Sequence, residues 1–563
     1  MRSIYCACLT ALLLLSSTQA QPSAGTKSAA EWWKSAVIYE IYPRSFADSN
    51  GDGVGDLNGI AKRLDYLKDL GVDAIWITPF YPSPQVDFGY DISDFVNIDP
   101  KYGTLADFDR LVAEAKKRNI RVLADLVLNH TSNQHPWFVD SRSSRTSAKA
   151  DWYVWRDPKP NGQPPNNWIS IFGHSAWELA PTRGQFYYHE FYKEQPDLNW
   201  RNPAVRKAIY DVMRFWMKRG VAGFRLDAFT MLFEDAQFRD EPVARPGANA
   251  YGDPILTSEY TNNLPELHDV MKEMRKVTEE FSGRVLIGET YLPGLKDMLA
   301  LYGENNDEVQ LPMDTQFGFI DKLDVRAFRI KLREAETGLR GNTPLLVFEN
   351  HDRPRLVNRY GDGKHNEAIA KLLATLLLAP RGSALMYFGQ EIGMENHDPQ
   401  RVEDVLDPIG KLGWPKEKGR DGVRTPMQWD TTANAGFSTA AKTWLPVGSD
   451  YKARNVAAQM ADPNSILNYY RALIRLRREN VAMREGTFEL LAESDPNVLC
   501  WTQKASDGSA IVVALNFTGT PQTMPIDRGT QGKIALSSFA DGKVADLKNL
   551  TLPAYGAVIA TTR

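Results

Sequence analysis

Three acidic residues stand at or just after the ends of short apolar runs that are far apart in the sequence. Asp227 ends "GFRLD", Glu289 follows "RVLIG", and Asp352 closes "FENHD". Cleavage of an acetal bond needs one carboxyl group that protonates the leaving oxygen and a carboxylate on the other side of the sugar ring. A single acidic residue after a strand is more often the N-cap of the next helix. The combination with basic neighbours favours a carboxylate active site; these neighbours are His130, Arg225 and His351.

The elements that must carry these residues are short β-branched or aliphatic runs that alternate with helical stretches. The stretch 202–220 is typical of a helix, because Asn202 can cap it and Pro203 fits its first turn. A strand-then-helix order repeated about eight times indicates a parallel sheet. We favour a (β/α)8 TIM barrel over a doubly wound sheet, with the active residues at the C-terminal strand ends. Strands are predicted at 36–42, 72–77, 120–128, 223–227, 284–289, 343–349 and 383–389.

Two parts of the chain depart from this alternation. The long connection between the third strand and the helix at 202 is rich in Trp, Pro, Gly and Asn, and such a connection is usually functional or a small inserted domain. Beyond residue 480, short apolar runs separated by turn residues predict an antiparallel β-sandwich. We predict a barrel in two parts (32–130 and 202–478), an inserted domain (131–201) and a C-terminal β domain (479–563).

Composition and the first residues limit the class of protein. The chain has 563 residues, 43% of them hydrophobic, and a net charge of -4, so we expect neither a nucleic-acid footprint nor a basic membrane surface. Residues 1–20 are typical of a secretory signal, because a short apolar run follows Arg2 and small residues end at Ala20. That run is too short to span a membrane. Residues 21–31 are linker-like, and we expect a periplasmic or secreted protein of undetermined oligomeric state.

Cysteine content agrees with this picture. Cys6 and Cys8 would leave with the signal, and Cys500 would remain alone. A lone cysteine forms no disulfide within the chain, so stability must come from the size of the core.

A loop early in the chain, "DSNGDGVGD", places oxygen-bearing residues at alternate positions, as an EF-hand loop does. An EF-hand would need an acidic residue at the twelfth position, which is Gly59, and a helix before the loop, where a strand is predicted. A calcium sensor is therefore not expected. Hard oxygen donors still suit structural Ca²⁺, with Mg²⁺ as the second choice, and the alternative is a metal-free turn. The predicted ligands are Asp48, Asn50, Asp52, the carbonyl of Val54, and Asp56.

Several motifs occur together in a fixed order. They are "DLVLNH" (125–130), "QPDLNW" (195–200), "GFRLDA" (223–228), "GET" (288–290), "ENHD" (349–352) and "RTPMQWD" (424–430). With these motifs the sequence resembles glycoside hydrolase family 13, the α-amylase superfamily, from about Trp32 to the C-terminus. Within that family it resembles the α-glucosidase and oligo-1,6-glucosidase group, in which the loop described above is a structural calcium site.

The resemblance implies a role for each matching residue. Asp227 would be the nucleophile, kept ionised by Arg225, and Glu289 would be the acid and then the base. Asp352 would stabilise the transition state through the sugar hydroxyls. His130 and His351 would hydrogen-bond the same ring. Tyr90 would give that ring a stacking face, and Asp125 would be a structural partner of Arg225.

The resemblance also implies the mode of attack. Asp87 and Arg420 resemble the pair that closes the far side of the glucose pocket, although Arg424 is an alternative to Arg420. A pocket closed there would release single glucose units from non-reducing ends. Ala228 after the nucleophile favours α-1,4 over α-1,6 bonds, although one such residue discriminates by only about 1–3 kcal/mol. No organic cofactor is expected.

Other functions stay open at this point. The closest alternative is an α-glucosyl transferase or sucrose isomerase of the same family, which shares the first chemical step. A non-catalytic relative, the ectodomain of a transporter subunit, fits less well because all three carboxylates are present. A calcium-binding module fits least, for the reasons given for the loop.

Overall fold

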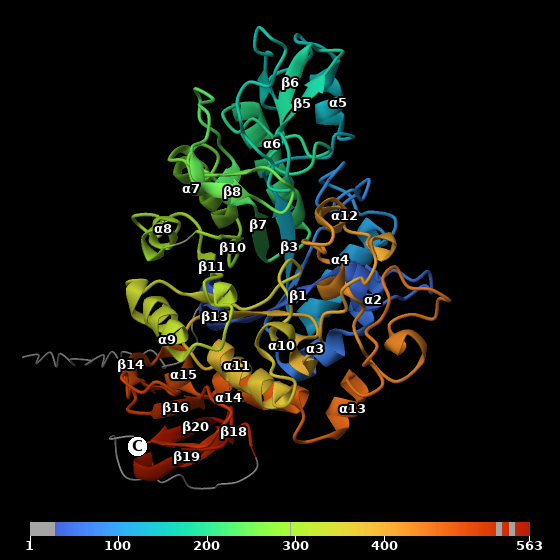
Figure 1. Ribbon diagram of the computed structural model, residues 1–563. Coiled ribbons are helices and arrows are strands. Elements are labelled where there is room, and N and C mark those ends of the chain that lie inside the picture. The colour runs from blue at the N-terminus through green and yellow to red at the C-terminus, as the bar shows by residue number, and fades with distance from the viewer. Residues whose placement is uncertain (1–28, 293, 525–531, 540–546, 563) are drawn as a thin grey trace, which may run out of the picture.

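A computed structural model describes residues 29–292, 294–524, 532–539 and 547–562 of the chain (Figure 1). The predicted signal segment and most of the predicted linker lie outside these ranges, so export stays a prediction. Within these ranges no helix has both the length and the apolar composition needed to cross a membrane.

The centre of the molecule is a closed barrel of eight parallel strands, which confirms the predicted fold class. The barrel strands are β1 (Val37–Ile41), β2 (Ala74–Ile77), β3 (Arg121–Val127), β7 (Gly223–Asp227), β10 (Val285–Gly288), β11 (Leu311–Asp314), β12 (Leu345–Val347) and β13 (Ser383–Tyr387). Seven of them fall within the predicted runs. Their side chains are almost all buried, as expected for a parallel sheet covered by helices.

The strand that the sequence did not reveal is β11. It has four residues and contains Pro312, and a proline within a run argues against a strand. Pro312 is tolerated in this strand because β11 pairs with β10 and with β12 over a short parallel register only.

Helices surround the barrel, and α6 shows why they form. Asn202 accepts a hydrogen bond from the backbone N–H of Ala204, Pro203 occupies the first turn, and the apolar face with Trp216 is buried. The helices are α1 (Pro43–Phe46), α2 (Leu57–Lys62), α3 (Leu64–Leu70), α4 (Leu105–Lys117), α5 (Pro136–Ser143), α6 (Pro203–Lys218), α7 (Glu266–Glu279), α8 (Leu295–Ala300), α9 (Val325–Arg333), α10 (Leu356–Tyr360), α11 (Asn366–Leu378), α12 (Pro408–Gly413), α13 (Val456–Ala461), α14 (Ile466–Glu479) and α15 (Val481–Glu485).

Two excursions leave the barrel on its functional side. The segment between β3 and α6 forms its own three-stranded antiparallel sheet in the order β4-β6-β5, from β4 (Trp155–Arg156), β5 (Trp177–Ala180) and β6 (Gln185–Tyr188). A hairpin of β8 (Val243–Ala248) and β9 (Pro254–Leu256) follows β7. Figure 1 shows the three-stranded sheet at one end of the molecule and the C-terminal strands at the other.

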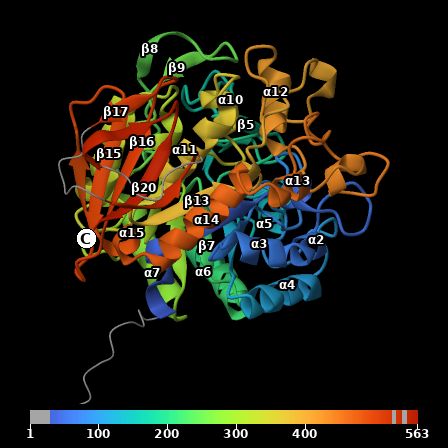
Figure 2. The same ribbon diagram turned by 90° about the horizontal axis from the view of Figure 1, so that it is seen from below.

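The C-terminal strands form two antiparallel sheets, in agreement with the predicted β domain. The larger sheet has the order β14-β15-β16-β20-β18 and the smaller one pairs β17 with β19. Helices α11 and α14 contact the larger sheet, and Figure 2 shows it beside the barrel. The strands are β14 (Thr487–Leu491), β15 (Val498–Lys504), β16 (Ala510–Asn516), β17 (Gln522–Met524), β18 (Lys533–Ser537), β19 (Leu550–Leu552) and β20 (Ala557–Thr562).

Candidate active site

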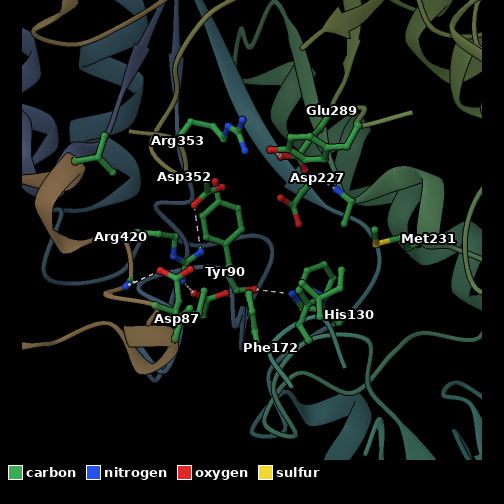
Figure 3. Close-up of a pocket in the computed structure, with 18 of the residues that line it drawn as sticks. Asp87, Tyr90, His130, Phe172, Asp227, Met231, Glu289, Asp352, Arg353 and Arg420 are labelled. Carbon is green, nitrogen blue, oxygen red and sulfur yellow. Dashed lines mark hydrogen bonds and ion pairs between the residues drawn. The ribbon is translucent and has the colours of Figure 1, made fainter. Parts of the chain in front are cut away.

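A cavity of about 520 Å³ opens at the C-terminal ends of the barrel strands. In Figure 3, Asp227 and Glu289 lie side by side on one wall, and Asp87 and Arg420 meet on another. Eight of the residues that the sequence singled out line this cavity: Asp87, Tyr90, His130, Asp227, Ala228, Glu289, Asp352 and Arg420.

The register of β7 and β10 places the first two carboxylates together. Asp227 is the last residue of β7, and Glu289 follows the last residue of β10. Leu226 pairs with Gly288, and the N–H of Glu289 donates to the carbonyl of Leu226 at 3.1 Å. Neighbouring strands lie about 4.8 Å apart. The next pair along is therefore Asp227 beside Glu289, and such neighbouring positions suit the short separation of about 5–5.5 Å between the carboxyl groups of retaining glycosidases.

Arg225 joins these carboxylates. Residues two apart on a strand share a face, so Arg225 points the same way as Asp227. Its Nη1 lies 2.5 Å from Oδ1 of Asp227 and 3.1 Å from Asp125, and its Nη2 lies 2.5 Å from Oε1 of Glu289. One buried guanidinium thus serves three buried carboxylates. Such an excess of negative charge favours retention of a proton within the group.

The same cluster shifts the acidity of its members. Burial raises the pKa of Asp227 well above its usual range, Arg225 opposes the shift, and the charges of Glu289 and Asp125 add to it. Burial likewise raises the pKa of Asp125 to about 6 against the pull of Arg225. Proton uptake by this cluster therefore begins at a higher pH than for free carboxylates.

Glu289 is held by two further donors. The backbone N–H of Ala228 donates to Oε2 at 3.0 Å, and the hydroxyl of Tyr291 donates to Oε1 at 3.0 Å. Ala228 has a left-handed backbone, with φ 44° and ψ 28°. That conformation costs an alanine on the order of 1 kcal/mol, and it is typical of functional sites. Here it aims the N–H at Glu289.

Asp352 is bound by three basic side chains. Its Oδ1 lies 2.6 Å from Arg424 and 3.1 Å from Arg420, and its Oδ2 lies 3.2 Å from Nε2 of His351. Burial alone would raise its pKa, but His351, Arg420 and Arg424 together hold that pKa well below the usual range. Asp352 therefore stays ionised while its carboxylate faces the cavity.

An ion pair between Asp87 and Arg420 forms part of the cavity wall next to Asp352. Arg420 Nη2 lies 2.7 Å from Asp87 Oδ1, and Asp407, which the sequence did not reveal, lies 2.8 Å from Arg420 Nε. Burial raises the pKa of Asp87 to about 6 although Arg420 lowers it. Gln195, in the motif of the inserted segment, donates from Nε2 to Asp87 at 3.2 Å.

The two arginines that the sequence left open have different places. Arg420 lines the cavity and contacts Asp87 directly. Arg424 is fully buried behind it, where Nε donates to the carbonyl of His351 at 2.9 Å. The assignment of Arg420 to the closing pair agrees with this geometry.

The two histidines also differ. His130 lines the cavity, and its Nε2 lies 3.0 Å from Nε2 of Gln195. Its Nδ1 has no protein partner within the described ranges, and burial lowers its pKa to about 3. His351 is instead stacked between Tyr90 and Tyr42, and is not among the residues that line the cavity. This placement does not bring His351 to the cavity wall, where the resemblance implied a hydrogen bond to the sugar ring.

Several lining residues carried no signal in the sequence. Phe172 and Phe191 come from the inserted segment, Tyr251 from the turn between β8 and β9, and Arg353 follows Asp352 directly. Aromatic residues are frequent throughout these stretches, so only the fold shows which of them face the cavity.

The loop of predicted metal ligands is held by its own hydrogen bonds. Asp48 accepts from the backbone N–H of Gly51 at 2.8 Å and of Gly53 at 2.9 Å, and Asp52 accepts from that of Val54 at 2.8 Å. Asp56 caps α2. Across the part of the chain that the structure describes, no three His, Cys, Asp or Glu side chains are grouped to hold a metal ion. The donor chemistry of the loop still suits Ca²⁺, because each carboxylate oxygen has a second lone pair, so the calcium site stays a prediction.

Comparison with known proteins gives consistent results. Residues 40–486 match the model of the alpha-amylase catalytic domain. The chain is 43% identical to a protein of Rhizobium meliloti (strain 1021) named "Probable alpha-glucosidase", over 94% of this chain and 97% of that one. It is 41% identical to the oligo-1,6-glucosidase of Parageobacillus thermoglucosidasius, over 86% and 90% of the two chains.

Among solved structures, the chain resembles an α-glucosyl transfer enzyme. The TM-score is 0.86 and the identity 39%, over 94% of this chain and 99% of the other. At this level of identity the likeness extends beyond fold alone, while the reactions of these proteins range from hydrolysis to glucosyl transfer.

Proposed function

This chain belongs to the α-amylase family and is a glycoside hydrolase, and from that premise we propose that it is a retaining, exo-acting α-glucosidase. The observation that carries the proposal is the placement of Asp227 and Glu289 on adjacent strand ends, both bound to Arg225. The Asp87–Arg420 pair in the cavity wall, which resembles the pair that closes the glucose pocket in the family, supports the exo mode of attack.

In the first step Asp227 attacks the anomeric carbon. Its Oδ1 is bound by Arg225, and within the described ranges no group donates to Oδ2, which leaves that oxygen for the attack. A glucosyl ester forms while the bond to the leaving oxygen breaks, and Glu289 transfers its proton to that oxygen. The attack needs the ionised form of Asp227. Burial raises the pKa of Asp227, and Arg225 opposes that shift and stabilises the carboxylate, while the guanidinium itself exchanges no proton.

In the second step water replaces Asp227. Glu289, now ionised, takes a proton from the water, whose oxygen bonds to the anomeric carbon, and Asp227 leaves as a carboxylate. The N–H of Ala228 and the hydroxyl of Tyr291 stabilise the ionised Glu289 in this half of the cycle. Two inversions give net retention of the α configuration.

Asp352 and the closing pair bind the glucose unit. The ionised Asp352 accepts hydrogen bonds from hydroxyls of the sugar ring. These hydrogen bonds strengthen as positive charge develops on the ring in the transition state. Asp87 and Arg420 bind the hydroxyls at the non-reducing end, so a chain cannot extend past them. Ala228 supports a preference for α-1,4 bonds of maltose-type substrates.

Anomeric NMR during maltose hydrolysis tests the proposal. We expect α-glucose as the first product, released one unit at a time, and no cleavage of a maltoside whose non-reducing end is blocked. Asp227→Asn is expected to lower kcat on the order of 10⁴-fold or more. Glu289→Gln should retain the first step with p-nitrophenyl α-glucoside, because that leaving group needs little protonation. A β-configured first product, or unchanged activity of Asp227→Asn, would refute the mechanism.

Glucosyl transfer is the second candidate function, supported by the likeness to the α-glucosyl transfer enzyme. There a sugar or alcohol hydroxyl replaces water in the second step, and sucrose isomerisation is the internal form of the same exchange. The ratio of free glucose to new disaccharide from maltose and from sucrose distinguishes these outcomes. Products that are entirely transferred would replace hydrolysis as the main activity.

A further inference from the structure

A second cavity, of about 390 Å³, lies between α3 and α14 and is separate from the active site. We call it the basic cavity, because four basic side chains line it, namely Lys68, Arg471, Arg475 and Arg478, against one carboxylate, that of Asp69. Small-molecule sites have volumes of about 300–1,000 Å³, so the basic cavity is large enough for a small ligand. The whole chain has a net charge of -4, so this concentration of positive charge is local.

The basic cavity lies at the opposite end of the barrel from the active site. Helix α3 ends at Leu70 and β2 begins at Ala74, so the end of α3 stands where that strand enters the barrel. Asp227 and Glu289 stand where the strands β7 and β10 leave it. Figure 2 shows α3 beside α14, and the two cavities share no lining residue. A ligand in the basic cavity therefore leaves the active site free.

Three arginines form a stripe along one face of α14. Arg471, Arg475 and Arg478 are spaced four and three residues apart, so their side chains leave the helix on the same face. Like charges at this spacing destabilise a helix by about 0.2–0.5 kcal/mol per pair. Lys68, in the last turn of α3, adds a fourth positive charge from the neighbouring helix. An anion bound between the two helices would relieve this repulsion.

Two of the arginines are held in place by the end of α3. Arg478 Nη2 donates to the carbonyl of Gly71 at 2.7 Å and lies 3.4 Å from Oδ1 of Asp73. Arg471 Nε donates to the carbonyl of Asp69 at 3.4 Å. A guanidinium group has five N–H donors, so these contacts orient both groups and still leave donors for a ligand.

Arg475 and Lys68 have no such contacts. Both residues are exposed, and among the residues that the structure describes neither side chain donates a hydrogen bond or forms an ion pair. A single free cation is ordinary on a protein surface. Here two free cations line the same cavity as Arg471 and Arg478, whose guanidinium groups are already oriented. The four charges can therefore act together on one ligand.

We propose that the basic cavity binds a small ligand with more than one phosphate group, either free in solution or presented by lipid headgroups. Arginine binds phosphate through paired N–H donors, and lysine adds a point charge. Arg471 and Arg478 are about 10 Å apart along the helix axis, at about 1.5 Å per residue, so the stripe is longer than one phosphate group. The bound ligand bridges α3 and α14 and stabilises the fold without changing catalysis.

Calorimetric titration of the full chain with inorganic diphosphate at low ionic strength tests the proposal. We expect saturable binding of one diphosphate per chain that weakens as salt is added. Arg475→Gln and Lys68→Gln should each weaken the affinity about fivefold, and Arg475→Lys should weaken it less because the charge stays. The matched control is Arg326→Gln, at an exposed position on α9, which should leave the affinity unchanged. The turnover of p-nitrophenyl α-glucoside should be the same in all these variants.

Cosedimentation with vesicles identifies the source of the phosphate groups. Binding to vesicles of phosphatidylglycerol and phosphatidylcholine, but not of phosphatidylcholine alone, with a loss in Arg475→Gln, would assign the ligand to lipid headgroups. Binding of diphosphate without binding to either kind of vesicle would assign it to a free ligand. The proposal is overturned if neither probe binds. It is also overturned if Arg475→Gln and Lys68→Gln bind diphosphate as the wild type does, or if Arg326→Gln weakens binding as much as they do.

Discussion

Glu40 Oε1 lies 2.6 Å from Nδ1 of His351, and both side chains are fully buried beneath the cavity. The same oxygen accepts from the backbone N–H of His351 at 3.3 Å. His351 in turn contacts the hydroxyl of Tyr90 at 2.8 Å and Asp352 at 3.2 Å through Nε2. A residue on β1 therefore orients the loop that carries Asp352, without touching the cavity itself.

This contact predicts different outcomes for two substitutions at Glu40. Glu40→Gln can still hydrogen-bond Nδ1 of His351, so we expect kcat within a few-fold of wild type. Glu40→Leu leaves a buried imidazole nitrogen without a partner, which costs about 1–3 kcal/mol, and we expect kcat to fall on the order of tenfold or more. Steady-state kinetics with maltose checks this. Equal loss in both variants would mean that charge, rather than orientation, is what Glu40 supplies.

The closing pair predicts a pH dependence of substrate binding. Burial raises the pKa of Asp87 to about 6, so Asp87 gains a proton as the pH falls through that value and loses its ion pair with Arg420. We expect KM for maltose to rise below about pH 6 in the wild type. In Asp87→Asn, KM should be high and nearly constant over the same range. A wild-type KM that stays flat from about pH 7 to pH 5 would contradict this assignment.

The barrel and its main carboxylates were predictable from sequence for local reasons. Seven barrel strands lie in largely apolar runs, and Asp227 and Glu289 stand at or just after the ends of two of them. The short β11, interrupted by Pro312, has too few residues to give such a run.

Contacts between distant segments were not predictable in the same way. Asp407 and Tyr251 approach the cavity only because the segment after β13 and the hairpin after β7 fold against the inserted segment. The spacing of residues in the sequence does not predict these contacts with the cavity. The two arginines of "GRDGVR" could likewise be separated only by their burial and their partners.

The predicted calcium loop can be tested by metal removal. We propose that Ca²⁺ binds to Asp48, Asn50, Asp52, Val54 and Asp56, and expect a chelator to lower Tm by several degrees. Asp52→Asn keeps an oxygen that can accept from the N–H of Val54, and removes one charge from the metal site. We therefore expect its Tm to respond little to the chelator. A wild-type Tm that the chelator does not change would show a turn held by its own hydrogen bonds.

Buried Glu190 in the inserted segment predicts how stability depends on pH. Burial raises the pKa of Glu190 to about 8, although the hydroxyl of Tyr188 donates to its carboxylate and lowers that pKa. The folded protein then keeps a proton that the unfolded chain releases above about pH 4.5. A raised pKa in the folded state means that stability is full at low pH and is lost as the pH rises towards 8. The loss is about 1.4 kcal/mol per pH unit for one such group.

Glu190→Gln removes this proton exchange while preserving the shape of the side chain. Relative to wild type, we expect the variant to gain stability steadily as the pH rises from about 5 to about 8, measured by denaturant unfolding at each pH. Tyr188→Phe removes the hydroxyl that stabilises the carboxylate, so in that variant the loss should extend to higher pH. Asp197, whose pKa is raised by burial and further by the charge of Glu190, titrates together with Glu190 and contributes to the difference measured for Glu190→Gln. A constant difference between wild type and Glu190→Gln over this range would mean that Glu190 is ionised in the folded protein.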